Sequence, residues 1–124
     1  MTNKAIEFDF ISTKGFIYGV IKVVGNLTHQ DYEFFVPLFE QELLNIKNPK
    51  VRILVDLTEF TGWDLRAAWD DLKFGLKHNN EFTHIAVVGN NKLYEYGVKI
   101  SNWFTHYEMQ YFHSIKEAKE WMGV

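Results

Sequence analysis

VRILVDL, residues 51–57, is the stretch of this 124-residue chain that decides its fold. Its nearly continuous run of β-branched residues and leucine predicts a strand buried on both faces, as in a parallel sheet covered by helices. A similar run follows at His84–Gly89, and the residues between the two runs, about Asp64–His78, have the periodicity of a helix. Strands that alternate with helices in this way predict right-handed βαβ crossovers and a largely parallel sheet.

Two further strands are expected at the N-terminal end of the chain. Ile6–Ile11 and Phe16–Val24 are rich in apolar and β-branched residues, and the polar segment Ser12–Gly15 separates them. This pattern predicts a β-hairpin, which would add an antiparallel part to the sheet and make it mixed.

A helix is expected after the hairpin. Thr28 and Asp31 have the spacing of a capping box, so the helix should begin there and continue to about Ile46. Pro37 lies inside this segment and predicts either a kink or a separate first turn, because proline lacks the N–H that a helix interior needs.

The C-terminal third of the chain continues the alternation. Asn90 or Asn91 can cap a third helix through about Phe104, Glu108–His113 reads as a short strand, and Ser114 opens a last helix that ends at Met122. The predicted order is β-β-α-β-α-β-α-β-α, a single α/β domain that covers residues 1–124.

Composition excludes several classes of function. The 13 basic and 16 acidic residues give a net charge of −3 without a basic cluster, which argues against a nucleic-acid binder. The absence of cysteine excludes disulfides, thiolate metal sites and thiol nucleophiles. The segment Met1–Lys4 lacks the features of a signal peptide, so a cytoplasmic protein is expected.

No catalytic or cofactor-binding motif is recognisable. The chain has no P-loop, no G-x-S-x-G and no G-x-G-x-x-G, and the spacing of its 5 histidines does not suit a metal. We therefore expect a protein that is not an enzyme and that uses no cofactor. Asp70 and Asp71 are interpreted as part of a solvated helix face that pairs with Lys73, Lys77 or Arg66.

Apolar residues on the predicted helices exceed what one core-facing stripe needs. The first helix has a single stripe made of Tyr32, Phe35, Val36, Phe39, Leu43 and Ile46. The second has a core stripe and, on its opposite side, another apolar face. The residues left outside the core stripes predict a surface patch or a pocket wall, with coverage by neighbouring elements as the alternative; they are Trp63, Ala67, Phe74, Phe34 and Leu38.

Polar residues follow the carboxyl ends of the two buried strands, where open parallel sheets bind ligands. Thr58, Thr61, Gly62 and Asn90 would together form a nest for an anion or a polar head group. The alternative is that they serve only as turn and cap residues.

Several of these segments together resemble the SpoIIAA-like family of the STAS superfamily. The resemblance lies in the strand 51–57, the Thr61-Gly62-Trp63 stretch, residues 67–72, the strand 85–89 and the C-terminal strand and helix with Tyr111, Phe112, Ala118 and Trp121. It implies a mixed sheet of four or five strands with helices packed mainly on one face.

The same resemblance implies two functions. In the anti-sigma-factor antagonists of that superfamily, a serine before a glycine is phosphorylated by a partner kinase, and Thr61 before Gly62 matches that position. Glu59-Phe60-Thr61-Gly62 stands where those proteins have Asp-Ser-Ser-Gly. The SpoIIAA-like branch is also similar to lipid-carrier domains of the CRAL-TRIO type, which implies small apolar ligands or membrane surfaces.

Three hypotheses follow. The first is a non-catalytic module that binds a small apolar or amphipathic ligand, or associates peripherally with a membrane. The second is a regulator that binds a protein partner and is switched at Thr61. The third is a homodimer formed through the same apolar patch.

Overall fold

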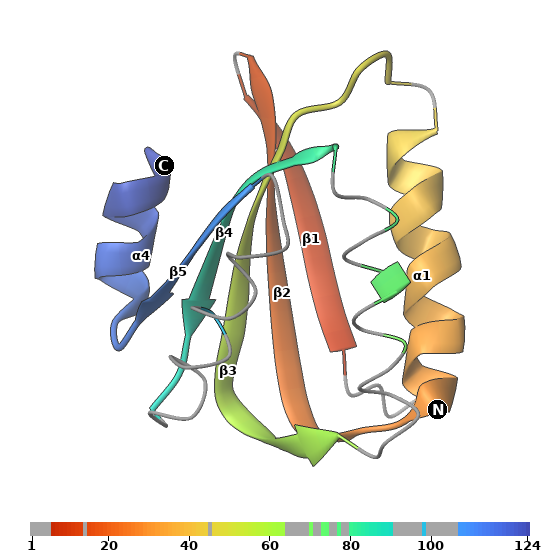
Figure 1. The fold of residues 1–124 in the computed structure, drawn as a ribbon, viewed down its shortest axis with the longest axis vertical. Coiled ribbons are helices and arrows are strands. Elements are labelled where there is room, and N and C mark those ends of the chain that lie inside the picture. The colour runs from red at the N-terminus through yellow and green to blue at the C-terminus, as the bar shows by residue number, and fades with distance from the viewer. Residues whose placement is uncertain are drawn as a thin grey trace.

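The computed structural model describes residues 6–13, 15–44, 46–63, 70, 73–74, 77, 80–90, 98 and 107–124. Its elements are β1 (Ile6–Thr13), β2 (Phe16–Leu27), α1 (His29–Leu43), β3 (Val51–Trp63), β4 (Phe82–Val88), β5 (Glu108–Phe112) and α4 (Ile115–Met122). The five strands form one sheet in the order β1-β2-β3-β4-β5, in which β1 is antiparallel to β2 and the other pairs are parallel (Figure 1). The predicted mixed α/β fold is confirmed.

The second and third predicted helices lie mostly outside the described residues. Of the second, Asp70, Lys73, Phe74 and Lys77 are described and are helical, and Val98 is the helical residue described from the third. We refer to the former four as the 70–77 face, because their spacing of three, four and seven residues places them on one side of a helix.

The N-terminal hairpin forms as predicted, with longer strands. Its turn contains Gly15 at a φ of 89°, a left-handed conformation that glycine adopts without strain. Within β2, Gly19 lies directly beneath the ring of Phe10, and a Cβ atom there would overlap that ring and the Cδ1 atom of Ile53. Glycine is therefore needed at this position for β1 and β3 to pack over β2.

Helix α1 begins with the predicted capping box. The Thr28 hydroxyl accepts a hydrogen bond from the Asp31 amide, and the Asp31 carboxylate accepts one from the Thr28 amide at 2.8 Å. The helix continues through Pro37, so the expectation of a separate first turn is wrong. Proline has no N–H, so the Glu33 carbonyl lacks the hydrogen bond that residue 37 would otherwise donate. Both residues are exposed, and water can donate to that carbonyl instead. The helix ends at Leu43, which leaves Ile46 outside the stripe and exposed.

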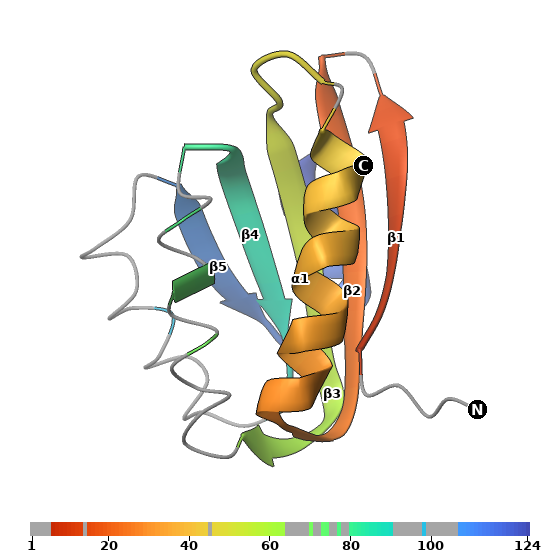
Figure 2. The ribbon, with the colours of Figure 1, turned by 90° about the vertical axis from the view of Figure 1, so that its right-hand side faces the viewer.

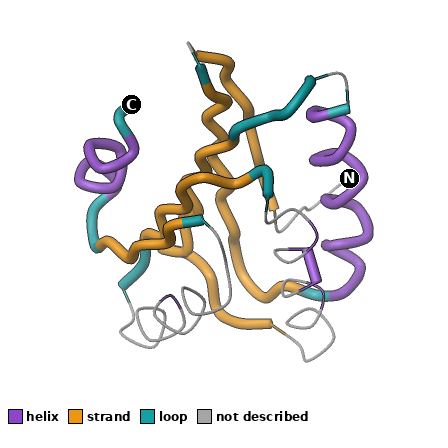
Figure 3. The backbone as a smooth tube through the Cα atoms, turned by 45° about the horizontal axis from the view of Figure 1, so that its top comes forward, coloured by secondary structure: helices purple, strands orange, loops and turns teal. Residues whose placement is uncertain are grey.

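Two cores lie on opposite faces of the sheet. Helix α1 and the 70–77 face cover one side, and α4 covers the other (Figures 1, 2 and 3). Phe39, which is fully buried, has its ring 4.8 Å from that of Phe74 and 5.4 Å from that of Phe10. Each buried aromatic ring contributes about 1.5–3 kcal/mol by burial. Much of the aromatic excess is therefore core packing.

Strand β3 is longer than predicted. It was expected to end at Leu57, but it continues to Trp63 and pairs with the end of β2 through Asn26↔Gly62 and Leu27↔Trp63. Two register shifts in the pairing, between Lys22 and Val24 and between Gly25 and Asn26, realign the strands so that the ladder continues. Thr61 and Gly62 therefore belong to a strand, and not to a turn before a helix.

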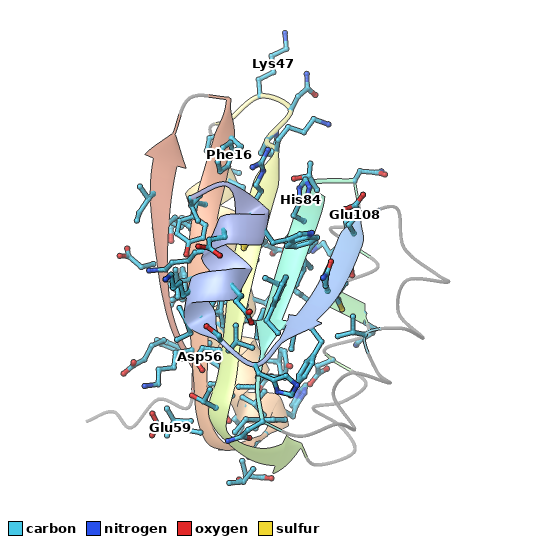
Figure 4. The ribbon with its side chains drawn as sticks, turned by 90° about the vertical axis from the view of Figure 1, so that its left-hand side faces the viewer. Phe16, Lys47, Asp56, Glu59, His84 and Glu108 are labelled. Carbon is cyan, nitrogen blue, oxygen red and sulfur yellow. The ribbon has the colours of Figure 1, made fainter. Side chains whose placement is uncertain are left out.

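Helix α4 is held on its face of the sheet at both ends. The Ser114 hydroxyl accepts a hydrogen bond from the Glu117 amide, as predicted for its N-cap. At the other end, Arg52 Nη1 donates to the Met122 carbonyl at 2.6 Å, and its guanidinium lies 3.9 Å from the ring centroid of Phe16. Figure 4 shows Phe16 and His84 near one end of this face and Asp56 and Glu59 at the other.

Candidate functional site

A groove of about 310 Å³ lies between α1 and the 70–77 face. Its walls come from two helical surfaces with the same spacing of three, four and seven residues. Helix α1 contributes His29, Tyr32, Glu33 and Val36, and the other wall consists of Asp70, Lys73, Phe74 and Lys77. Two segments that are about forty residues apart in the chain therefore form one concave surface. This separation in sequence is larger than the span of a local motif.

The apolar part of the groove is anchored in the core. Tyr32 is buried and Val36 is half-buried, and Phe74 reaches from the opposite wall to pack on Phe35 and Phe39 at ring distances of 5.7 and 4.8 Å. Phe74 was expected in a surface patch or a pocket wall. The alternative was coverage by neighbouring elements, and Phe74 does pack against the core through Phe35, Phe39 and Phe82, while part of it also lines the groove.

A histidine–carboxylate contact and a lysine–carboxylate ion pair connect the walls. His29 Nδ1 lies 2.5 Å from Asp70 Oδ2, and Lys77 Nζ lies 2.6 Å from Glu40 Oε2. At a rise of about 1.5 Å per residue, His29 and Glu40 are about 16 Å apart along α1. The groove therefore lies between two cross-links that bridge its walls.

The polar end of the groove is built around His29. Its Nδ1 contacts Asp70, whose side chain is only 11% exposed, and its Nε2 lies 3.5 Å from Glu33 Oε2. Lys73 is bound less closely, since its Nζ is 3.9 Å from Asp70 Oδ1, beyond hydrogen-bond distance, and its side chain is 59% exposed.

The residues predicted at the strand ends do not line this groove. Thr58 donates its hydroxyl to Asp56 Oδ1 at 2.7 Å, and Asp56 is buried on the α4 side, two residues after Leu54. Thr61 and Asn90 are exposed, and Gly62 has a φ of 149°. In the described part of the chain, the residues predicted to form a head-group nest are thus not among those that line the apolar groove.

The other predicted apolar residues have different positions. Phe34 is 47% exposed and Leu38 is half-buried, and neither is among the described residues that line the groove. The backbone of Trp63 ends β3, whereas its side chain and all of Ala67 lie outside the described residues.

The residues that the sequence interpretation missed are those of the polar end. His29 was grouped with the other histidines, and Asp70 was assigned to a solvated face that pairs with lysines. Asp70 does approach Lys73, but its short contact is with His29. One signal in the sequence could have suggested that the two helices face each other. Both carry polar and apolar residues at the same spacing, at positions 29, 32, 33 and 36 and at positions 70, 73, 74 and 77.

The lining of the groove combines apolar and charged side chains. Its centre is apolar, its rim is charged, and the described residues contain no group of three or more metal-ligating side chains placed to hold an ion. Such a surface suits a molecule with an apolar body and a polar end. No helix in the described residues is long and apolar enough to cross a membrane.

This fold, a mixed five-stranded sheet with helices on both faces, is that of a regulatory or binding module. The profile of the SpoIIAA-like family matches residues 19–123, and the chain belongs to that family. It is similar to the crystal structure of an uncharacterised protein of the DUF3478 family with a SpoIIAA-like fold from Shewanella loihica PV-4. The two are 40% identical over 98% of this chain and 96% of the other, with a TM-score of 0.84. The comparison with curated proteins found no match.

Proposed function

We propose that this protein is a non-catalytic module that binds a small amphipathic ligand in the groove between α1 and the 70–77 face. The observation that carries the proposal is an apolar centre, formed by Tyr32, Val36 and Phe74, between two cross-links that bridge the walls. A surface of this kind loses water on binding an apolar chain, while the charged rim receives the polar end of the ligand.

The volume of the groove limits the ligand. At about 30 Å³ for each water-sized atom, 310 Å³ holds roughly ten non-hydrogen atoms. Such a ligand gains roughly 0.5 kcal/mol per atom, which gives a Kd of about 0.2 mM. The expected ligand is therefore a small molecule, or one chain of a larger amphiphile, bound with modest affinity.

Two variants of α1 test the location of the site. In Val36→Trp the new indole would fill the groove, whereas in Phe34→Trp the same side chain replaces an exposed residue of the same helix. Binding of single-chain decyl amphiphiles, followed by isothermal titration calorimetry, should be lost in Val36→Trp and kept in Phe34→Trp. Binding that survives in Val36→Trp would place the site elsewhere.

Membrane association is the competing outcome of the same test. Phe34 is the large apolar residue that α1 exposes to solvent outside the groove, and an interfacial helix inserts such residues. If wild type sediments with anionic liposomes and Phe34→Ser does not, while decyl amphiphiles fail to bind in solution, peripheral membrane binding replaces the groove hypothesis.

A regulatory role with a protein partner is the second candidate. Thr61 is exposed in β3, so a kinase could reach its hydroxyl, and phosphate would add about two negative charges there. Thr61→Glu should then alter the recovery of a partner in pull-downs, and a phosphopeptide should cover Thr61. If neither is observed while Thr61→Val behaves as wild type, this role is excluded.

A further inference from the structure

We infer that the groove selects single-chain amphiphiles with an anionic head, and that Lys73 binds the head. This inference rests on the proposed function, since it names the ligand class of the same groove. Three observations support it: the partners of each charged side chain at the groove, the position of Lys73 beside the apolar centre, and the length of the groove.

The charged side chains of the groove are not equally available. His29 lies between two carboxylates, those of Asp70 and Glu33, and Lys77 is in close contact with Glu40 at 2.6 Å. Lys73 is 3.9 Å from its nearest carboxylate, so among the described residues no acceptor receives a hydrogen bond from its three ammonium donors. An anionic head would satisfy these donors.

A cationic head would have to compete for Asp70 or Glu33. Asp70 is held by His29 at 2.5 Å, and binding there would displace the imidazole and break one of the cross-links between the walls. Glu33 is 64% exposed and lies 3.5 Å from His29 Nε2, so it is the carboxylate at which an ammonium head would compete. A neutral head could enter the groove but would leave the Lys73 ammonium without an acceptor.

The position of Lys73 also suits a head with an attached chain. Lys73 and Phe74 both line the groove, and the Lys73 side chain is 59% exposed whereas Phe74 packs against the core. The two cross-links limit the groove to about 16 Å along α1. One chain of roughly ten atoms fills that length and volume, whereas the two chains of a phospholipid do not.

Three probes with one chain length test the inference with the whole protein. Decanoate and decyltrimethylammonium are titrated below their micelle-forming concentrations and decanol below its solubility limit, at a pH where decanoate is ionised. Wild type should bind decanoate about fivefold more tightly than decanol, the effect of one partly exposed charge contact. Added salt should reduce this preference, because it screens exposed charges. The salt response needs no variant.

Lysine variants assign the head group to its site. Lys73→Met, which keeps the apolar stem, should bind decanoate and decanol equally, whereas Lys119→Met, at an exposed position of α4 outside the groove, should keep the preference for decanoate. Equal binding of decanoate and decanol by wild type, or tighter binding of the ammonium probe, would overturn the inference and leave the proposed function intact. Failure of all three probes to bind would refute the proposed function itself.

Discussion

The His29–Asp70 pair should contribute much more to stability than the Lys77–Glu40 pair, although both bridge the same two walls at nearly equal distance. The separations are 2.5 and 2.6 Å, so distance does not distinguish them. Exposure does, because the His29 and Asp70 side chains are 25% and 11% exposed, against 65% and 33% for Lys77 and Glu40. Desolvation and screening therefore decide the outcome.

The magnitudes follow from the environment of each pair. With the imidazole protonated, an effective dielectric constant of about 20 gives about 6.6 kcal/mol of attraction for His29–Asp70. Desolvation of the two groups offsets most of this, and a net coupling of about 2 kcal/mol is expected. For the exposed pair, water reduces the attraction to about 1.6 kcal/mol, and side-chain entropy leaves a coupling of about 0.5 kcal/mol.

Two double-mutant cycles measure these couplings. One uses His29→Ala, Asp70→Ala and the double variant, and the other uses Lys77→Ala, Glu40→Ala and their double variant. Urea unfolding is followed by circular dichroism and by tryptophan fluorescence, and coincident curves justify two-state analysis. In thermal unfolding, 1 kcal/mol corresponds to about 4 °C for a chain of this size.

Two outcomes of these cycles would contradict the expected order of the two couplings. A coupling below about 0.5 kcal/mol for His29–Asp70 would mean that the pair is solvated and does not join the walls. A Lys77–Glu40 coupling equal to or larger than that of His29–Asp70 would show that burial is not the factor that decides between them.

Three further predictions concern the rest of the fold. Burial raises the pKa of Tyr18, because the buried site disfavours the charged phenolate. The stabilisation that the neutral side chain gives the folded state is therefore complete below about pH 10, and it is lost as the pH rises through the raised pKa of the folded state. Alkaline unfolding, followed by tyrosinate absorbance and circular dichroism, should begin at higher pH in Tyr18→Phe, and an unchanged profile would contradict this. Arg52→Met removes the donor to the Met122 carbonyl and should cost about 1–2 kcal/mol, with hydrogen exchange accelerated in α4 more than in α1; uniform acceleration would refute a local role. Thr28→Ala should cost about 1 kcal/mol in urea unfolding, and Thr28→Ser should restore most of it, because both hydroxyls cap the helix.

The elements that the sequence predicts well are those whose signals are local. The capping box at Thr28 and Asp31, the N-cap at Ser114 and the apolar run at Val51–Leu57 each involve residues within a few positions of one another. Their stabilising contacts form within one turn or one strand, so a pattern of residue types is enough to identify them.

Elements that depend on distant partners were predicted less well. Strand β3 continues past Leu57 because the end of β2 pairs with it, and nothing in the residues after Leu57 requires that pairing. Ile46 continues the apolar period of α1, but the helix ends before it, and the chain passes into Asn48, at a φ of 51°, and then Pro49. Tertiary pairing and turn geometry override local periodicity in both places.

The candidate site shows the same division. Phe74 could be singled out from the helical wheel, but the wheel alone could not distinguish a surface patch or pocket wall from a side chain that neighbouring elements cover. The answer depends on Phe35 and Phe39, which lie in another helix and present their rings to Phe74. The polar end was not foreseen, because the short contact joins His29 and Asp70 across 41 positions of the chain.

Residue types alone predict the mixed α/β fold, the caps of both described helices and the apolar stripe of α1 that forms one core. Folding then brings two helical faces together, bridges them through His29–Asp70 and Lys77–Glu40 and leaves Lys73 exposed in the groove, none of which a residue pattern predicts. The difference lies in the range of the interactions. Backbone propensities and caps act within a few residues, whereas a groove exists only where surfaces that are remote in the chain meet.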